Sequence, residues 1–191
     1  MNYLLNAFSF LLDIVFGALA TLFVLRLVAE ASRVDFHNPV SQFIYRYTNP
    51  VLAPLRRVLP NWRRINLAAI VVAWAIMLVK RLIQFAMVGI APNALGLMLL
   101  SLVELADFIL LFYIVVIFVW SLMGLFQVDR YHPVMRLCDT LVSPLLRPVR
   151  GKLVVGMFDF GPWAVLIGLT LARMLVIDPL RDQCARLVLG L

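Results

Sequence analysis

Six ionisable side chains stand inside long apolar runs of this sequence. They are Asp13, Lys80, Arg81, Glu104, Asp107 and Arg173. A charged side chain at the centre of a bilayer costs at least about 2.5 kcal/mol on insertion scales, so each needs a partner, water or a function. Three are acids and three are cations, which makes the set electrically balanced. Two interpretations stay open: ion pairs that fix helix register, or a path for protons, ions or a small charged solute.

The spacing of these residues indicates an internal relationship. Asp13 and Asp107 are 94 residues apart, and Lys80 and Arg173 are 93 residues apart. Each acid therefore occupies the same position in the first apolar run of one half of the chain. Each cation occupies the same position in the second run.

The turn near Pro92 lies midway between opposite charges. Lys80 and Arg81 precede it by eleven or twelve residues, and Glu104 follows it by twelve. At 1.5 Å rise per residue, two antiparallel helices place such groups at similar depth. We therefore predict a buried polar layer in the outer half of a bilayer, with acids and cations paired across helices.

Four apolar runs must position this layer. The chain has 191 residues, 64% of them hydrophobic and only 14% charged, where a soluble domain carries about a quarter. Each run is close to or longer than the roughly 20 residues needed to span a bilayer. Asp13 interrupts the first run and no Lys or Arg precedes it, so we expect a retained span, not a signal peptide. The predicted spans are about 3–28, 66–90, 94–126 and 160–177, the last ending at Asp178-Pro179.

The distribution of cations predicts the orientation. Two segments between spans carry most of the Lys and Arg outside the spans, and the C-terminal tail adds only Arg181 and Arg186. The positive-inside bias then places both long loops in the cytoplasm and both termini in the periplasm. The loop cations are Arg33, Arg46, Arg56, Arg57, Arg63 and Arg64 in the first loop, and Arg130, Arg136, Arg147, Arg150 and Lys152 in the second.

The chain reads as two repeats of one unit. Shifting the sequence by 94 residues superimposes Val34-Asp35 on Val128-Asp129, together with several prolines. We predict a first repeat over 1–92 and a second over 93–191, each a helix, an amphipathic segment and a helix. The two repeats share one orientation, so their pseudo-two-fold axis lies along the membrane normal. The fold class is an all-α membrane protein with four transmembrane helices.

Each loop carries an amphipathic segment, over 38–60 and 132–152. Asn38-Pro39 is a helix-start signal, because Asn caps a helix and Pro suits its first turn. The apolar side chains that follow recur at helical spacing, which predicts a short helix in the membrane interface. Asn49-Pro50 and Ser143-Pro144 then predict a fresh turn. The expected apolar faces are Val40, Phe43, Ile44 and Tyr47, with Ser41, Gln42 and Arg46 facing elsewhere, and Val134, Leu137, Cys138 and Leu141.

The basic residues of both segments are candidate contacts for anionic lipid headgroups or for acidic groups of a membrane-protein partner. Each cation near an anionic membrane surface contributes about 1 kcal/mol. Topology signal plus lipid anchoring is the simpler interpretation, and a dedicated binding site is the alternative. The candidates are Arg46, Arg56, Arg57, Arg63, Arg64, Arg136, Arg147, Arg150 and Lys152.

The repeated motif resembles the YggT family of membrane proteins. The resemblance covers about residues 15–90 and 110–178. The motif has an Asn/His-Pro pair, an aromatic-rich amphipathic stretch, and then Pro-x-x-x-Pro-x-Arg. Asp159-Phe160-Gly161-Pro162 matches the family signature at the entry to a second span, whereas Asn66-Leu67-Ala68-Ala69 departs from it. The motif positions are Asn38, Pro39, Pro50 and Pro54 in the first repeat, and His132, Pro133, Pro144, Pro148, Asp159 and Pro162 in the second.

The resemblance implies a bacterial inner-membrane protein linked to osmotic stress tolerance or ion homeostasis. In chloroplasts it implies assembly of cytochrome haem attachment, or nucleoid organisation. It offers no catalytic residues to carry over.

Three classes of function follow from the residues. We favour a non-enzymatic scaffold, assembly or stress-tolerance protein that binds membrane-protein partners or itself, and anionic lipid. The alternative is a channel, transporter or transport regulator. We expect no enzyme, because no nucleophile–base pair or phosphate-binding glycine loop is present. We also expect no cofactor, no metal site and no nucleic-acid partner, since only two His occur and the cations lie beside spans.

Overall fold

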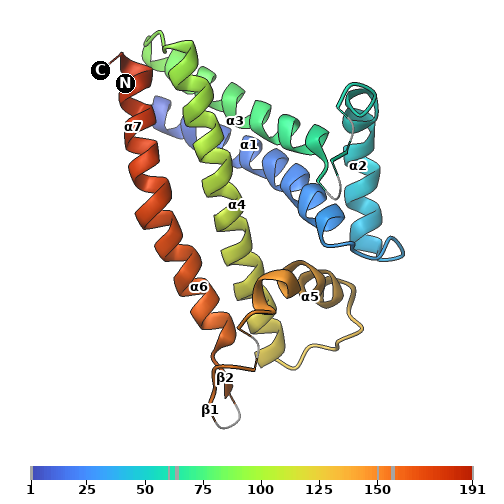
Figure 1. The fold of residues 1–191 in the computed structure, drawn as a ribbon. Coiled ribbons are helices and arrows are strands. Elements are labelled where there is room, and N and C mark those ends of the chain that lie inside the picture. The colour runs from blue at the N-terminus through green and yellow to red at the C-terminus, as the bar shows by residue number, and fades with distance from the viewer. Residues whose placement is uncertain (1, 60, 63–64, 150, 156–157, 191) are drawn as a thin grey trace.

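The computed structural model describes residues 2–59, 61–62, 65–149, 151–155 and 158–190 (Figure 1). Four long helices dominate it. They are α1 (Asn2–Ala31), α3 (Leu67–Val88), α4 (Ala94–Leu125) and a fourth that runs from Gly161 to Leu189. All four are long and apolar enough to cross a membrane. This confirms the prediction of an all-α protein with four membrane spans.

The fourth helix corrects the predicted span of 160–177, because it does not end at Asp178-Pro179. It consists of α6 (Gly161–Ala172), a π-helical turn η1 (Arg173–Ile177) and α7 (Asp178–Leu189). Within the π turn the Asp178 N–H donates to the Arg173 carbonyl. Pro179 then falls in the first turn of α7, where its fixed φ fits a helix and its missing N–H matters least. The segment counted as a tail is therefore a continuation of the fourth helix.

The two amphipathic segments form α2 (Pro39–Leu55) and α5 (Pro133–Leu146), which begin at the predicted prolines. The predicted turns at Asn49-Pro50 and Ser143-Pro144 are wrong, because α2 continues through Pro50 and Pro54 and α5 through Pro144. All three prolines are exposed. Proline already has a helical φ, and the carbonyls that lose a donor there lie near the surface.

The buried face of α2 also differs from the predicted one. Ser41, Ile44 and Thr48 are buried, whereas Phe43 and Tyr47 are each 56% exposed. The rings of Phe43 and Tyr47 contact one another in a tilted arrangement, with centroids 4.5 Å apart. Ser41 was expected to face elsewhere. The small polar side chains lie inward because α2 packs against other helices, and Thr48 donates to the Ile44 carbonyl at 2.7 Å. In α5 the buried residues include the predicted Leu137, Cys138 and Leu141.

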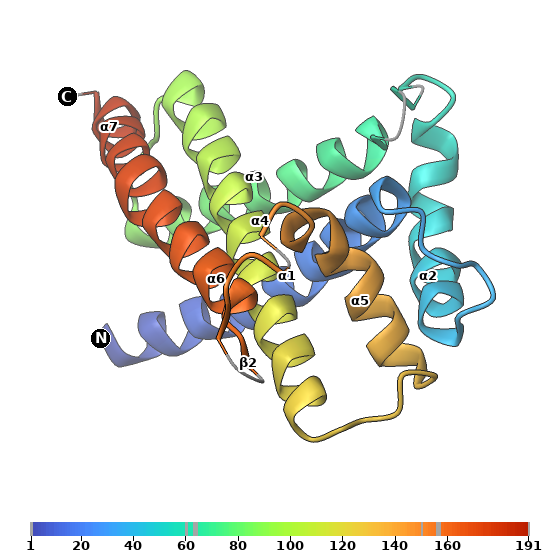
Figure 2. The same ribbon diagram turned by 60° about the horizontal axis from the view of Figure 1, so that its bottom comes forward.

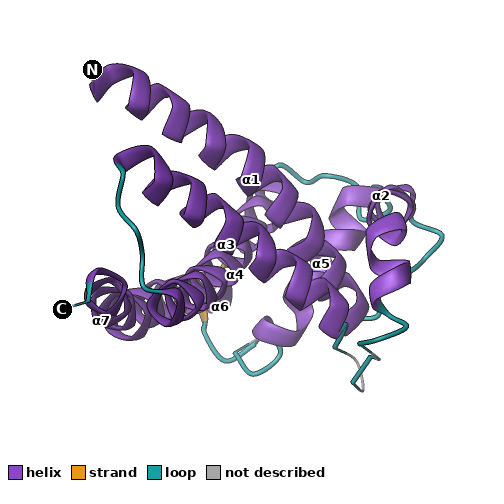
Figure 3. Cartoon of the chain, turned by 90° about the horizontal axis from the view of Figure 1, so that it is seen from above, coloured by secondary structure: helices purple, strands orange, loops and turns teal. Residues whose placement is uncertain are grey.

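The helices associate as two pairs. α1 packs on α3, and α4 packs on α6 and α7, while α3 joins the pairs by contacting α4. Viewed from above, α1 and α3 lie lengthwise and the other pair is seen nearly end-on, so the two pairs are inclined to one another (Figure 3). The main apolar core lies among α1, α2 and α3, with contributions from α4 and α5.

α2 and α5 contact each other at the end of the molecule opposite both termini (Figures 1 and 2). A hairpin of two short antiparallel strands, β1 (Val154–Val155) and β2 (Phe158–Asp159), leads into α6. Gly96 marks a close approach of two helices: an added Cβ would lie 2.6 Å from the Val188 backbone nitrogen in α7. A Cβ on Gly17, Gly89, Gly124 or Gly168 would meet nothing within 4 Å.

Candidate functional site

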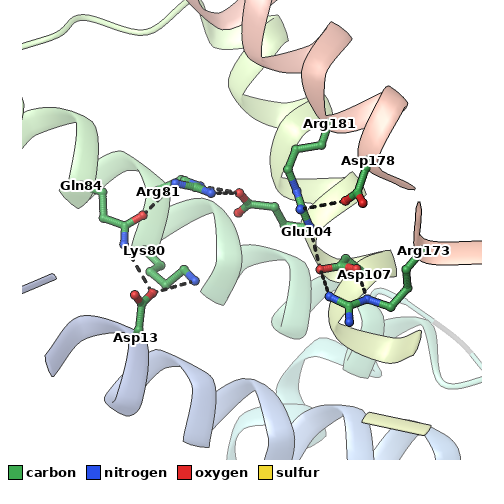
Figure 4. Close-up of polar contacts among 9 residues, drawn as sticks. All are labelled: Asp13, Lys80, Arg81, Gln84, Glu104, Asp107, Arg173, Asp178 and Arg181. Carbon is green, nitrogen blue, oxygen red and sulfur yellow. Dashed lines mark hydrogen bonds and ion pairs between the residues drawn. The ribbon is translucent and has the colours of Figure 1, made fainter. Parts of the chain in front are cut away.

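The structure brings the charged residues of the spans into pairs between helices (Figure 4). In the first repeat, Lys80 Nζ on α3 lies 3.1 Å from Asp13 Oδ1 on α1. At the equivalent place in the second repeat, Arg173 Nε lies 2.6 Å from Asp107 Oδ1 on α4. The acid of each first helix therefore pairs with the cation of its own second helix.

A further pair joins the two repeats. Arg81 on α3 forms an ion pair with Glu104 on α4, across the turn near Pro92. Gln84 connects this pair to the first one, because it accepts from Arg81 at 3.2 Å and donates to Asp13 at 3.4 Å. Glu104 is only 8% exposed, and its Oε2 finds no hydrogen-bond donor in the described part of the chain.

Asp107 is the most heavily bonded acid of the spans. Besides the bidentate contact with Arg173, its Oδ2 accepts from Arg181 Nη2 at 2.6 Å. Arg181 also donates to Asp178 at 3.2 Å. Sequence reasoning placed Arg181 and Asp178 outside the span, and Gln84 was overlooked because it carries no charge. With both added, the layer holds four acids and four cations and remains neutral.

The pairs form a polar layer that touches all four spans. It runs from α1 through α3 and α4 to the fourth helix (Figure 4). A cavity of about 210 Å³ lies within it, lined by Lys80, Arg81, Glu104, Asp107 and Arg181 together with apolar side chains. Opposite charges face each other around this cavity, so the layer can fix helix register or hold a small polar solute.

A second charged cluster, at the other end of α1, was missed from the sequence. Arg26 is 1% exposed, and its Nη2 lies 2.6 Å from Glu30 Oε1. Arg56 Nη2 bonds the same oxygen at 2.6 Å, and the Arg26 guanidinium carbon lies 3.3 Å from the centre of the Tyr45 ring. Burial raises the pKa of Tyr45, so its phenol is neutral. The i, i+4 spacing of Arg26 and Glu30 inside an apolar run was the signal available.

The predicted surface cations divide into paired and exposed groups. Arg56 belongs to the cluster just described, and Arg136 on α5 pairs with Asp35 of the first repeat at 3.3 Å. The backbone N–H of His37 lowers the pKa of Asp35. Arg46, Arg57, Arg147 and Lys152 are exposed, with no ion-pair partner among the described residues. Arg63, Arg64 and Arg150 lie outside the described residues.

The residues of the repeated motif mark the ends of helices. Asn38 caps α2 by accepting from Val40 N at 2.9 Å, and its Nδ2 donates to the Pro133 carbonyl at 2.7 Å, which ties α2 to the start of α5. His132 caps α5 without a side-chain hydrogen bond. Asp159 Oδ1 accepts from Gly161 N at 2.8 Å and so stabilises the turn into α6, where Pro162 lies in the first turn. Pro148 is exposed beyond α5.

Two large pockets lie at equivalent places in the two repeats, between the end of the first span and the amphipathic helix. The pocket of the first repeat has a volume of about 770 Å³ and that of the second about 640 Å³. Residues 94 apart line both pockets. The six pairs are Glu30 with Gly124, Arg33 with Gln127, Val34 with Val128, Asp35 with Asp129, Phe36 with Arg130, and Tyr45 with Asp139.

The two cysteines are both free and buried. Burial raises the pKa of the Cys138 thiol, which makes it a poor nucleophile. The described residues contain no group of three or more His, Cys, Asp or Glu side chains placed to hold a metal ion.

Four apolar helices, two amphipathic helices at one end, and charges neutralised inside the spans define a multi-pass membrane protein. The family model described as CCB3/YggT matches this chain twice, over residues 4–87 and 99–180. The chain belongs to the CCB3/YggT family. Its two matches agree with the duplication found in the sequence.

Several curated relatives support this placement. The chain is 31% identical over 188 residues to a protein of Escherichia coli strain K12 described as uncharacterised protein YggT, covering 98% of both chains. It is 30% identical over 182 residues to an uncharacterised protein of Vibrio alginolyticus, covering 91% of this chain and 95% of the relative. An uncharacterised Pseudomonas aeruginosa protein is 32% identical over 168 residues, covering 86% and 85%. No solved structure matches the chain.

Proposed function

We propose that this chain is a non-enzymatic scaffold of the bacterial inner membrane, with an assembly or stress-tolerance role, that binds membrane-protein partners and anionic lipid. One observation carries the proposal: the cations of the polar layer are paired with acids, while four cations of the amphipathic segments are exposed and unpaired among the described residues. Arg46, Arg57, Arg147 and Lys152 are exposed and have no ion-pair partner among the described residues. Unpaired cations at the end of a span attract anionic headgroups or acidic partner surfaces.

The faces of the spans also suit a binding role. Large apolar side chains of all four long helices are exposed, and they present surface to lipid or to the spans of other proteins. The neutral charged layer stabilises this arrangement without leaving a net charge in the bilayer.

The experiment compares copurifying proteins and lipids after extraction in a mild detergent. A variant with Arg46→Gln, Arg57→Gln and Arg147→Gln should lose bound partner and anionic lipid, as read by mass spectrometry. The control is Arg186→Gln, which removes an exposed cation near the end of α7. If the triple variant retains the same proteins at the same stoichiometry as the unmodified chain, the scaffold proposal is wrong.

The proposed orientation has its own test. With Cys138 and Cys184 replaced by Ser, Arg57→Cys and Arg147→Cys should both react with a membrane-impermeant maleimide only after the membrane is opened. Both loops would then be cytoplasmic and both termini periplasmic. Labelling of the two positions from opposite faces would contradict the arrangement of two parallel repeats.

A second candidate is a channel, transporter or transport regulator, and one observation favours it. The cavity of about 210 Å³ lies among opposite charges of the spans, and the buried Glu104 contributes an oxygen without a described donor. Ion and proton flux into proteoliposomes should then fall on Glu104→Gln and stay unchanged on Asp182→Asn, an exposed acid on α7. Absence of flux with the unmodified chain would exclude this candidate.

A further inference from the structure

We infer that the pocket of the second repeat binds the headgroup of a zwitterionic phospholipid that carries a phosphate and a primary ammonium. This site goes beyond the proposed scaffold role. It concerns one lipid class at one pocket, not the free cations of the surface.

The position of the pocket fits a headgroup. Trp120 and Gly124 come from the last turns of α4, Asp129 and Arg130 from the loop after it, and Asp139 from α5. The end of a span beside an amphipathic helix lies at the depth of lipid headgroups. The volume of about 640 Å³ is in the range of small-molecule sites.

The pocket presents hydrogen-bond donors for a phosphate. Arg130 is exposed and has no ion-pair partner among the described residues. The indole Nε1 of Trp120 is buried and finds no acceptor in the described part of the chain. An indole N–H can only donate, so a phosphate oxygen is the kind of group that completes it.

The pocket also presents acceptors for a cation. Asp139 lines it from α5 and, within the described ranges, makes no ion pair. Asp129 accepts from Tyr131 N at 2.9 Å through Oδ1, and no salt bridge uses its carboxylate within those ranges. Arg136, which also lines the pocket, is already engaged by Asp35 at 3.3 Å. Two carboxylates are therefore available to one ammonium.

The balance of charge selects the headgroup. An anionic lipid without an ammonium would add a net negative charge to a pocket that already holds two carboxylates, Asp129 and Asp139. A quaternary ammonium carries charge but no N–H to donate. A primary ammonium donates up to three hydrogen bonds to carboxylates while its phosphate accepts from Arg130 and Trp120.

The first repeat shows why only one pocket has this chemistry. Its equivalent positions carry Phe36 where the second repeat has Arg130, and Tyr45 where it has Asp139. Arg26 stands where the second repeat has Trp120, and its Nη2 is already bound to Glu30. The first pocket also holds the exposed cation Arg33, but its two acidic side chains, Glu30 and Asp35, are already engaged in ion pairs with arginines. A free acceptor for an ammonium is therefore missing from the first pocket among the described residues.

The test is lipid binding to the full chain, followed by native mass spectrometry during titration with phosphatidylethanolamine. Phosphatidylcholine and phosphatidylglycerol with identical acyl chains are the comparison lipids. We expect the first phosphatidylethanolamine to bind about tenfold more tightly than either, the effect of about one charge-assisted hydrogen bond. Mono- and dimethylated phosphatidylethanolamine should bind progressively more weakly, a series that requires no variant of the protein.

Variants locate the site. Asp139→Asn should weaken phosphatidylethanolamine binding about tenfold, and Trp120→Phe should weaken it by a smaller factor. Asp182→Asn makes the same chemical change outside the pocket and should leave binding unaltered. Equal binding of the three lipids, or equal effects of Asp139→Asn and Asp182→Asn, would overturn the inference. Copurification of protein partners is a separate measurement, so the scaffold proposal and this site can fail independently.

Discussion

The two repeats share a plan but place their strongest polar contacts at opposite ends of the spans. In the first repeat the dense cluster is Arg26, Glu30 and Arg56 beside the amphipathic helix, and the pair in the outer part is the simple Asp13–Lys80 contact. In the second repeat the dense cluster surrounds Asp107, and Trp120 and Gly124 stand where the first repeat has Arg26 and Glu30. Duplication therefore preserved the helices while the charges that hold them diverged.

The largest expected effect breaks the first cluster. Glu30→Ala leaves two guanidiniums without their shared carboxylate, one of them buried, and should lower the free energy of unfolding by about 3–5 kcal/mol. The equivalent change in the second repeat, Gly124→Ala, meets open space and should alter it by less than about 1 kcal/mol. Reversible unfolding in bicelles measures both. Similar losses of unfolding free energy in the two variants would show that the repeats do not differ in where their strongest polar contacts lie.

The next effect compares the equivalent acids. Asp107→Asn leaves Arg173 without a carboxylate and Arg181 with Asp178 alone, and should cost about 3 kcal/mol, because Asp107 is 13% exposed. Asp13 is 54% exposed and holds one Lys, whose flexible chain can reach toward the interface, so Asp13→Asn should cost about 1 kcal/mol. Unfolding measured under the same conditions decides the order, and a greater loss for Asp13→Asn would reverse this comparison.

A third change tests packing that only the second repeat has. In Gly96→Ala the new Cβ would lie within 2.6 Å of the α7 backbone, which should cost about 1–3 kcal/mol through overpacking. Gly168→Ala adds the same methyl group on α6 with nothing within 4 Å, and serves as the control. The measurement is the midpoint temperature of thermal unfolding. If both variants unfold at the same temperature as the unmodified chain, α4 and α7 do not approach so closely.

The smallest effect concerns the two helix starts. Asn38→Ala removes a cap and the bond to the Pro133 carbonyl, and should cost about 1–2 kcal/mol. His132→Ala removes an exposed side chain that makes no cap bond, and should change stability by less than about 0.5 kcal/mol. Amide hydrogen exchange at the first turns of α2 and α5 gives the local readout. If His132→Ala speeds exchange in α5 as much as Asn38→Ala speeds it in α2, the two helix starts are not stabilised differently.

Much of the architecture follows from the sequence because it depends on length and period. The apolar runs predicted four spans, and the 94-residue offset predicted the duplication. Lys80, Arg81 and Glu104 lie eleven or twelve residues from the turn near Pro92, and this spacing predicted that opposite charges meet at one depth of the bilayer. Each of these depends on local spacing, which a single chain displays directly.

The features missed depend on contacts between distant segments. The cluster of Arg26 and Glu30 was missed because it lies in an apolar run and its other members come from a distant segment: Tyr45 contacts Arg26 and Arg56 pairs with Glu30. Helix continuation through Pro50 is permitted by tertiary packing, whereas proline alone predicts an end. The neutral side chain of Gln84 gave no signal, although it connects two ion pairs.

The π turn at Arg173–Ile177 changes the angular phase of the last helix. In an uninterrupted α-helix, Arg173 and Arg181 would be separated by eight steps of about 100°, which sets them about 80° apart. A π turn takes up one additional residue, so the two arginines behave as if seven residues apart and point to nearly the same side. Both guanidiniums can then grasp Asp107. Deleting one residue between 174 and 176 would restore regular α-helical winding and move Arg181 away from Asp107. The one additional residue of the π turn therefore allows two arginines of the second repeat to bind the same carboxylate.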